Sequence, residues 1–188
     1  MTATQSGPRI STEDFRFAFR SHPAGVAIVT ADAGDGPVAM TVSSVASVSI
    51  DPPTLMFSAS AGSSSTPTIR SAETLVVHLL AADHVELAKL GARRGAERFG
   101  DDVHWGRLPT GEPFYPDANW LRGRVIRRLD VEGATIIVVE AVEARPRDDG
   151  MSVDPTPLAY HNRHWHVLTD RSMLPPAVAP FYAVYGRE

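Results

Sequence analysis

The chain has 188 residues, of which 43% are hydrophobic and 21% are charged, a composition typical of a folded globular protein and a length that fits one domain. Its formal net charge of -4 and pI near 6.0 provide no electrostatic basis for binding nucleic acid. The absence of cysteine excludes disulfides, thiolate metal sites and a cysteine nucleophile.

The N-terminal region predicts a disordered start followed by a short helix. Residues 1–10 lack the apolar run of a signal peptide, and no stretch of the chain has the length of a membrane span, so we expect a cytoplasmic protein without membrane contact. Residues 11–14 supply an N-cap and first-turn acids for a helix that ends near Arg20. Phe15 and Phe19 share one face of this helix.

Alternating and β-branched residues predict strands along most of the remaining chain. The first two form a hairpin, residues 25–31 and 38 to about 48, around a turn rich in Gly and Asp. Further strands are expected at residues 54–60, 75–80, 123–129 and 135–144, and a final hairpin at residues 158–168 turns at Asn162 and Arg163.

Other segments separate these strands. Residues 61–68 are expected to form a serine-rich loop, residues 83–86 begin a second helix with a capping box, and residues 99–115 form an excursion broken by Gly and Pro. We therefore expect a disordered N-terminal segment at 1–10, one domain at 11–169 and a C-terminal arm at 170–188. The arm is rich in proline and aromatic residues, and either packs over a subunit partner or is disordered.

The element pattern indicates a mainly β fold. Six or more strands with few helices, placed at the edges, predict an antiparallel barrel with helical additions. The chain has neither alternating βαβ units nor a GxGxxG glycine fingerprint, which argues against a Rossmann dinucleotide domain.

Residues 43–53, SSVASVSIDPP, carry serines interleaved with valines and end in two prolines. This alternation indicates an extended segment with one apolar face and one face lined by hydroxyl groups. The residues alone permit two interpretations of these hydroxyls, hydrogen bonding to nearby backbone or contact with a ligand. Residues 60–66 also permit two interpretations, a flexible linker or a phosphate-binding turn.

Four motifs, taken in order, resemble those of the short-chain flavin reductase family. They are GVAIVTA, AMTVSSVASVSIDPPTLMFS, ERFGDDVHWG and PLAYHNRHWHVL, and the resemblance covers about residues 15–168. It implies a split β-barrel, a Greek-key antiparallel barrel that binds FMN, with peripheral helices. It also implies a homodimeric NAD(P)H:flavin oxidoreductase that binds FMN, or FAD, and supplies reduced flavin to a partner monooxygenase of a two-component system.

The same resemblance implies where the flavin binds. The strand and serines that contact the ring and ribityl chain would be Met40, Thr41, Val42, Ser43, Ser44, Ser47 and Val48. The loop near the phosphate would be Ser60, Ser63, Ser64, Ser65 and Thr66, assisted by Arg98, which as an arginine can make bidentate phosphate contacts. The final hairpin would place Tyr160, Arg163 and Trp165 near the flavin.

The chain departs from the family at the histidine that helps to position nicotinamide. Gly133-Ala134 stands where the family has Gly-Asp-His, so His161 or His164 is the candidate to replace that imidazole. His164 and His166 share a strand face, but their spacing implies no third ligand, and we expect no metal site. A second departure is His78, where the family commonly has Asn.

The loss of that imidazole keeps two other functions open. One is a flavin-dependent oxidase or monooxygenase that acts directly on a small organic substrate without free NAD(P)H. The other is a non-catalytic module that holds flavin or haem, because a split barrel can bind a planar ligand without catalysing a reaction.

Overall fold

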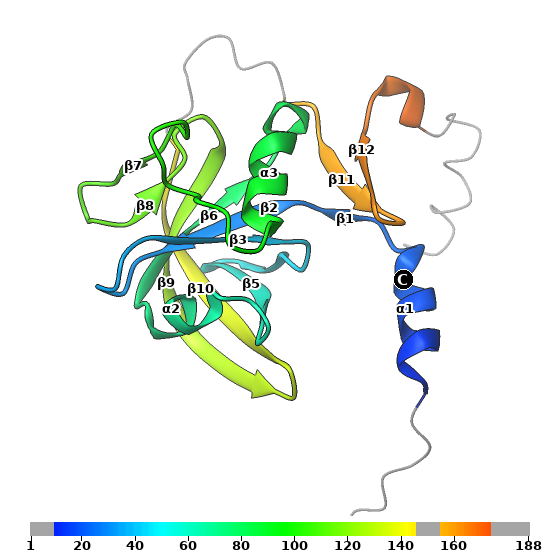
Figure 1. The fold of residues 1–188 in the computed structure, drawn as a ribbon, viewed down its shortest axis with the longest axis horizontal. Helices are drawn as coiled ribbons and strands as arrows, with labels where there is room; N and C mark the ends of the chain where they lie inside the picture. Colours follow the sequence, from blue (N-terminus) through cyan, green and yellow to red (C-terminus); the bar gives the residue numbers. More distant parts are fainter. Residues whose placement is uncertain (1–9, 146–154, 174–188) are drawn as a thin grey trace, which may run out of the picture.

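The main feature of the fold is one large antiparallel sheet, seen in a computed structural model that describes residues 10–145 and 155–173 (Figure 1). Its seven strands lie in the order β3-β2-β6-β9-β10-β5-β4, so β3 and β4 are its two ends and the described sheet does not close. The strands are β2 (Ala27–Ala31), β3 (Val38–Val42), β4 (Ala46–Ile50), β5 (Pro53–Ser60), β6 (Thr74–Leu79), β9 (Asn119–Val131) and β10 (Ala134–Ala144). This architecture confirms the mainly β fold class.

A small second sheet lies beside the large one. It contains β1 (Ala24–Gly25), β11 (Leu158–His161) and β12 (His164–Val167), in the order β1-β11-β12. The predicted strand at residues 25–31 is therefore interrupted at Val26, and its two parts belong to different sheets. A third, two-stranded sheet, β7 (Gly106–Arg107) with β8 (Pro113–Phe114), lies in the predicted excursion.

The helices lie at the periphery, as predicted. They are α1 (Thr12–Arg20), α2 (Thr66–Ser71) and α3 (Val85–Ala92), with short 3₁₀ turns at Ala82–His84 and Asp170–Ser172. The hydroxyl of Ser11 accepts a hydrogen bond from the Asp14 N–H at 3.0 Å, which confirms the predicted N-cap. Helix α1 buries none of its residues and stands beside β1 and β11, away from the large sheet (Figure 1).

The prediction of one strand from Val38 to about Val48 is wrong. The chain leaves the sheet after β3, crosses over at residues 43–45, and enters the opposite end of the sheet as β4, which pairs with β5. A hydrogen bond attaches the crossover to β5, because the Ser44 hydroxyl accepts from the Ser58 N–H at 2.9 Å. The hydroxyl pattern therefore belongs to two edge strands and a crossover.

The prediction of a loop over residues 61–68 is correct only to Ser65. Helix α2 begins at Thr66, where Pro67 in the first turn lacks an N–H that would be unpaired there in any case. The predicted start at 1–10 and arm at 170–188 lie, apart from Ile10 and residues 170–173, outside the described residues, and the predicted domain boundaries stay a prediction.

Three clusters of buried apolar residues hold the fold together, and two of them position the site. One joins the strands of the large sheet and α2, and includes Val29, Phe57 and Ile137, all at most 1% exposed. The other packs α3 and the 99–118 segment against β2 and β3, and includes Ile28, Ala88 and Tyr115. None of the helices in the described residues combines the length and apolar character that a membrane crossing requires.

Candidate functional site

A groove of about 800 Å³ lies where α1, the crossover and the β11–β12 turn meet. This volume is within the range of pockets that hold small-molecule ligands. The crossover and the first residue of β4 contribute Ser43, Ser44, Val45 and Ala46, and the end of β11 with the turn that follows contributes residues 160–163. The N-terminal segment contributes Phe15, Arg16, Phe19, Arg20, His22, Pro23, Ala24 and Gly25.

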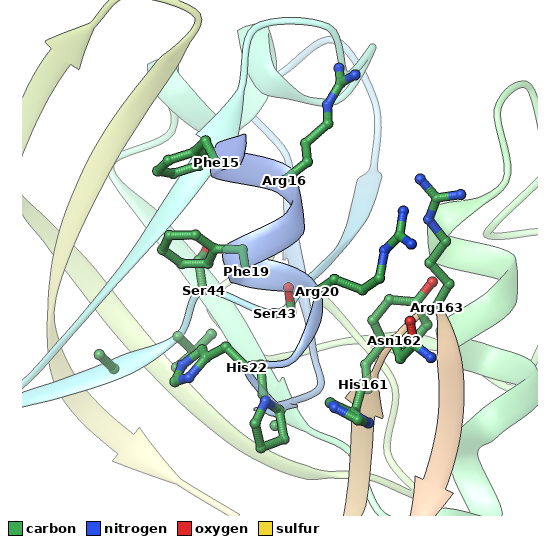
Figure 2. Close-up of a pocket in the computed structure, with 16 residues that line it drawn as sticks. Phe15, Arg16, Phe19, Arg20, His22, Ser43, Ser44, His161, Asn162 and Arg163 are labelled. Atoms are coloured by element: carbon green, nitrogen blue, oxygen red, sulfur yellow. The ribbon is translucent and has the colours of Figure 1, made fainter. Parts of the chain in front are cut away.

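Aromatic rings form one side of the groove. The ring centroids of Phe15 and Phe19 are 4.6 Å apart, and those of Phe19 and His22 are 6.1 Å apart. Figure 2 shows these three rings in one row, projecting to the same side of α1. Phe15 is 51% exposed and Phe19 is 58% exposed, so both rings are available to a planar ligand.

Cationic side chains form the other side. Arg16 and Arg20 extend from the neighbouring face of α1, directed away from the rings, and Arg163 extends from the β11–β12 turn, as Figure 2 shows. None of the described residues that line the groove is acidic. The groove is thus locally positive in a chain of net charge -4, which favours an anionic ligand.

The two serines of the crossover differ in what their hydroxyl groups bind. Ser44 is bonded to the backbone of Ser58, whereas Ser43 makes no side-chain hydrogen bond to a described residue. Ser43 can therefore donate to or accept from a ligand in the groove without losing a protein contact. The arrangement as a whole fits a flat aromatic ring system that carries polar edges and a negatively charged tail.

Five residues predicted from the sequence line this groove together: Ser43, Ser44, Tyr160, His161 and Arg163. Trp165 lies next to them, because its ring packs on that of Tyr160 with the centroids 4.8 Å apart. The assignment of these residues to a flavin stays a prediction.

The other predicted residues of the 40–48 segment do not line the groove. Met40 and Val42 are buried in the core, and the Thr41 hydroxyl donates to the Ala88 carbonyl at 2.7 Å, which attaches β3 to α3. Ser47 and Val48 lie on β4, beyond the crossover. Strand alternation explains the difference, because every second side chain of β3 points into the core.

The serine loop predicted for phosphate binding is largely bonded within the protein. The Ser65 hydroxyl donates to the Ala39 carbonyl at 2.8 Å and the Thr66 hydroxyl donates to the Ser60 carbonyl at 2.6 Å. The hydroxyls of Ser60 and Ser63 accept from backbone N–H groups of the same loop. Ser64 is exposed and has no side-chain hydrogen bond to a described residue. The loop does not line the groove.

Two other predicted residues, Arg98 and His164, and the position where the family histidine is missing, Ala134, also lie outside the groove. Arg98 donates to the Arg93 carbonyl at 2.7 Å, and its buried Nε has no partner among the described residues. His164 is exposed, with its Nδ1 2.7 Å from the Asn162 carbonyl. Ala134 begins β10, where it pairs with Ser60. The described residues contain no group of three or more His, Asp or Glu that could hold a metal ion.

Sequence reasoning missed the contribution of α1. The signal was present, because Phe15/Phe19 and Arg16/Arg20 are each spaced by four residues and so lie on adjacent faces of the helix. Such spacing is common on surface helices, however. Only the tertiary contact between the two ends of the domain, the Asn162 N–H to the Arg20 carbonyl at 3.1 Å, brings these residues to the hairpin turn.

Comparison with known proteins identifies the family. The model of the flavin reductase like domain matches residues 19–169. An NADH:FMN oxidoreductase of Rhodococcus qingshengii is 37% identical over 164 residues, which cover 85% of each chain.

Solved structures give the same result. A flavin reductase domain protein from Arthrobacter sp. FB24 superposes with a TM-score of 0.75 at 37% identity, over 84% of this chain and 95% of that one. BorF, the flavin reductase component of a bacterial two-component tryptophan halogenase, superposes with a TM-score of 0.72 at 30% identity, over 86% of this chain and 100% of that one.

Proposed function

Because the chain belongs to the flavin reductase like domain family, we propose that it is an oxidoreductase that reduces FMN with NADH or NADPH. The observation that supports this most directly is the groove of about 800 Å³, which is lined by aromatic rings, by three arginines and by Ser43, whose hydroxyl has no hydrogen-bond partner among the described residues. A flavin mononucleotide has the matching features: a flat ring, polar ring edges and an anionic phosphate.

Flavin, when bound, supplies the ring that accepts a hydride from a dihydronicotinamide. The chain's own residues then bind and orient the two reactants. Phe15 and Phe19 offer a surface for a planar ring, and the Ser43 hydroxyl can hydrogen-bond a polar ring edge. Because hydride transfer depends mainly on holding two rings face to face, no side chain is needed as nucleophile.

We propose two further properties. The first is that the reduced flavin is released to a two-component oxygenase partner, which is supported by the similarity to BorF. The second is a homodimer, which is supported by the large apolar side chains that the single chain leaves exposed, among them Ile10 and Phe17 of the α1 segment and Ile50 of β4. A cytoplasmic location stays a prediction.

The visible spectrum of the purified protein with added FMN, recorded anaerobically before and after NADH, tests the reductase function. We expect the visible absorption of the oxidised flavin to bleach much faster than in a protein-free blank. A rate equal to the blank with both NADH and NADPH would contradict the proposal. A flavin that stays tightly bound and reacts only with oxygen and an organic substrate would instead favour a direct oxidase or monooxygenase.

A further inference from the structure

Three histidines gather on one face of the β11–β12 hairpin. His161 and His164 are paired directly across the turn, and residues paired in an antiparallel ladder project to the same face. His166 lies two residues after His164 on β12, so strand alternation places it on this face as well. The pairing of the two strands therefore adds a third imidazole to the two that the sequence spacing places together.

The opposite face of the hairpin fixes this orientation. It carries the rings of Tyr160 and Trp165, which pack on each other with their centroids 4.8 Å apart and contact the cluster that joins α3 to β2 and β3. His164 and His166 are exposed, and His161 is half-buried. Turning the histidines toward the core would expose two large aromatic rings to water, so the fold keeps the imidazoles at the surface.

His161 and His166 have the ring separation of two imidazoles that share one metal ion. Their ring centroids are 5.5 Å apart. An ion bound about 2.1 Å from one nitrogen of each ring holds the two centroids about 5 Å apart when its geometry is tetrahedral. Neither imidazole makes a side-chain hydrogen bond or ion pair with a described residue, so ligation by these nitrogens breaks no described protein contact.

His164 lies outside this pair. Its ring centroid is 6.5 Å from that of His166, which exceeds the separation of two imidazoles on one tetrahedral ion. Its Nδ1 lies 2.7 Å from the Asn162 carbonyl, and this contact fixes the ring in place. A site of two imidazoles agrees with the lack, among the described residues, of a group of three side chains that could hold a metal ion.

We propose that His161 and His166 bind a divalent transition-metal ion whose remaining coordination positions are filled by water. The two ligands come from different strands of the hairpin, which is why spacing along the chain does not indicate the site. His161 also lines the groove, next to the turn that carries Arg163, so the ion lies at the edge of the groove (Figure 2). This proposal replaces the expectation that the chain has no metal site, and it does not depend on the reductase function.

The surroundings of the pair determine which kind of ion binds. Arg16, Arg20 and Arg163 line the adjoining groove, and none of its described lining residues is acidic. These positive charges oppose every cation, so only an ion with a strong preference for nitrogen ligands overcomes them. Imidazole suits Cu²⁺, Ni²⁺ and Zn²⁺, whereas Mg²⁺ and Ca²⁺ require oxygen ligands. The site therefore selects transition-metal ions.

Calorimetric titration of the tag-free full chain with Ni²⁺, Cu²⁺ and Mg²⁺ tests the proposal. We expect one Ni²⁺ ion per chain, tighter binding of Cu²⁺ than of Ni²⁺, and no detectable binding of Mg²⁺, the order that imidazole ligands produce. Binding of Mg²⁺ as tight as that of Ni²⁺ would indicate oxygen ligands and overturn the proposal. The titration contains neither flavin nor nicotinamide, so its failure is distinct from a failure of the reductase function.

His161→Asn and His166→Asn each remove one ligand. We expect each variant to bind Ni²⁺ at least about 10-fold more weakly than wild type, because loss of even an outer-shell partner of a ligating histidine has an effect of that size. The thermal midpoint should stay unchanged, since neither imidazole makes a described hydrogen bond. Ni²⁺ affinity equal to that of wild type in either variant would overturn the proposal.

Two further variants are controls. His164→Asn is matched to them because it removes an exposed imidazole from the same face of the hairpin. His104→Asn removes a different exposed imidazole, whose Nδ1 lies 2.6 Å from an Asp117 carboxylate oxygen and which is therefore the main competing site. We expect both to keep the Ni²⁺ affinity of wild type. Loss of Ni²⁺ binding in either control would overturn the assignment to His161 and His166.

Discussion

Among single residues, His78 of β6 shows how the fold can fix both the tautomer and the charge of a side chain. Its Nδ1 lies 3.1 Å from the Ile28 carbonyl, and its Nε2 accepts the Tyr115 N–H at 3.0 Å. Because a carbonyl only accepts and an N–H only donates, the neutral form with its proton on Nδ1 satisfies both contacts. Burial, with a smaller contribution from His84, lowers the pKa of His78 from 6.5 to about 4.

This lowered pKa predicts acid sensitivity. Between pH 6.5 and about 4 the unfolded chain binds a proton at His78 and the folded chain does not, so stability falls as the pH falls through this window. The contribution is about 1.4 kcal/mol per pH unit. Urea unfolding measures the free energy of unfolding at pH 6.5 and at pH 5. The decrease between these two pH values should be smaller for His78→Asn than for wild type, with the exposed His166→Asn as control. Equal losses would refute the prediction.

The two serines of the crossover make a matched pair for a second prediction. Ser44→Ala removes the acceptor of the Ser58 N–H and should lower the free energy of unfolding by about 1 kcal/mol. Ser43→Ala removes a hydroxyl without a described protein partner, so it should leave stability unchanged and weaken flavin affinity instead. Chemical denaturation and flavin titration of both variants check this. If Ser43→Ala destabilises the protein as much as Ser44→Ala, the assignment of Ser43 to the ligand is wrong.

At the scale of elements, the close contact of α3 with β3 positions the strand that leads into the groove. The Thr41 hydroxyl donates to the Ala88 carbonyl, and a Cβ at Gly91 would clash with the Thr41 Oγ1. Only glycine allows the helix to approach the strand this closely. The hydroxyl at position 41 takes part in this packing, and its contact with a ligand stays a prediction.

Gly91→Ala should therefore destabilise the protein by about 1 to 3 kcal/mol, the usual cost of overpacking. Thr41→Ala removes the atom that clashes, so the double variant should be less destabilised than the sum of the two single variants. Denaturant unfolding of the four proteins measures this coupling. Gly62→Ala, whose Cβ would meet its nearest neighbour at 3.8 Å, is the control and should change stability little. Strict additivity would show that the two residues do not share the contact.

At the scale of the whole molecule, the groove forms at the joint between two sheets. The chain passes from the small sheet to the large one at Val26, so β1 pairs with β11 while β2 pairs with β3 and β6. Groove residues that are more than 100 positions apart, such as Phe15 and Tyr160, meet because of this exchange. Helix α1 faces the groove with Phe15 and Phe19 but leaves Phe17, on its other side, 74% exposed.

A second copy that covers this surface would explain the exposed Phe17. Light scattering should give about twice the 20.3 kDa of the chain. Phe17→Ser should shift the molar mass toward that of the monomer at low concentration, because an exposed phenylalanine buried at an interface contributes strongly to binding. Glu13→Gln, on the same helix, should leave the mass unchanged. A monomeric wild-type protein would exclude the homodimer.

The sequence by itself determined the antiparallel β class, the capped first helix, the 158–168 hairpin with its turn at Asn162 and Arg163, and the family. These features depend on local periodicity, on caps and turns, and on short motifs, all of which are contained in neighbouring residues. The tertiary structure alone decided that residues 38–48 divide between opposite ends of the sheet, that the Thr41 hydroxyl faces α3, and that α1 contributes to the groove. Each of these depends on contacts between distant parts of the chain, such as Ser44 with Ser58 and Asn162 with Arg20, and local patterns carry no information about such pairings.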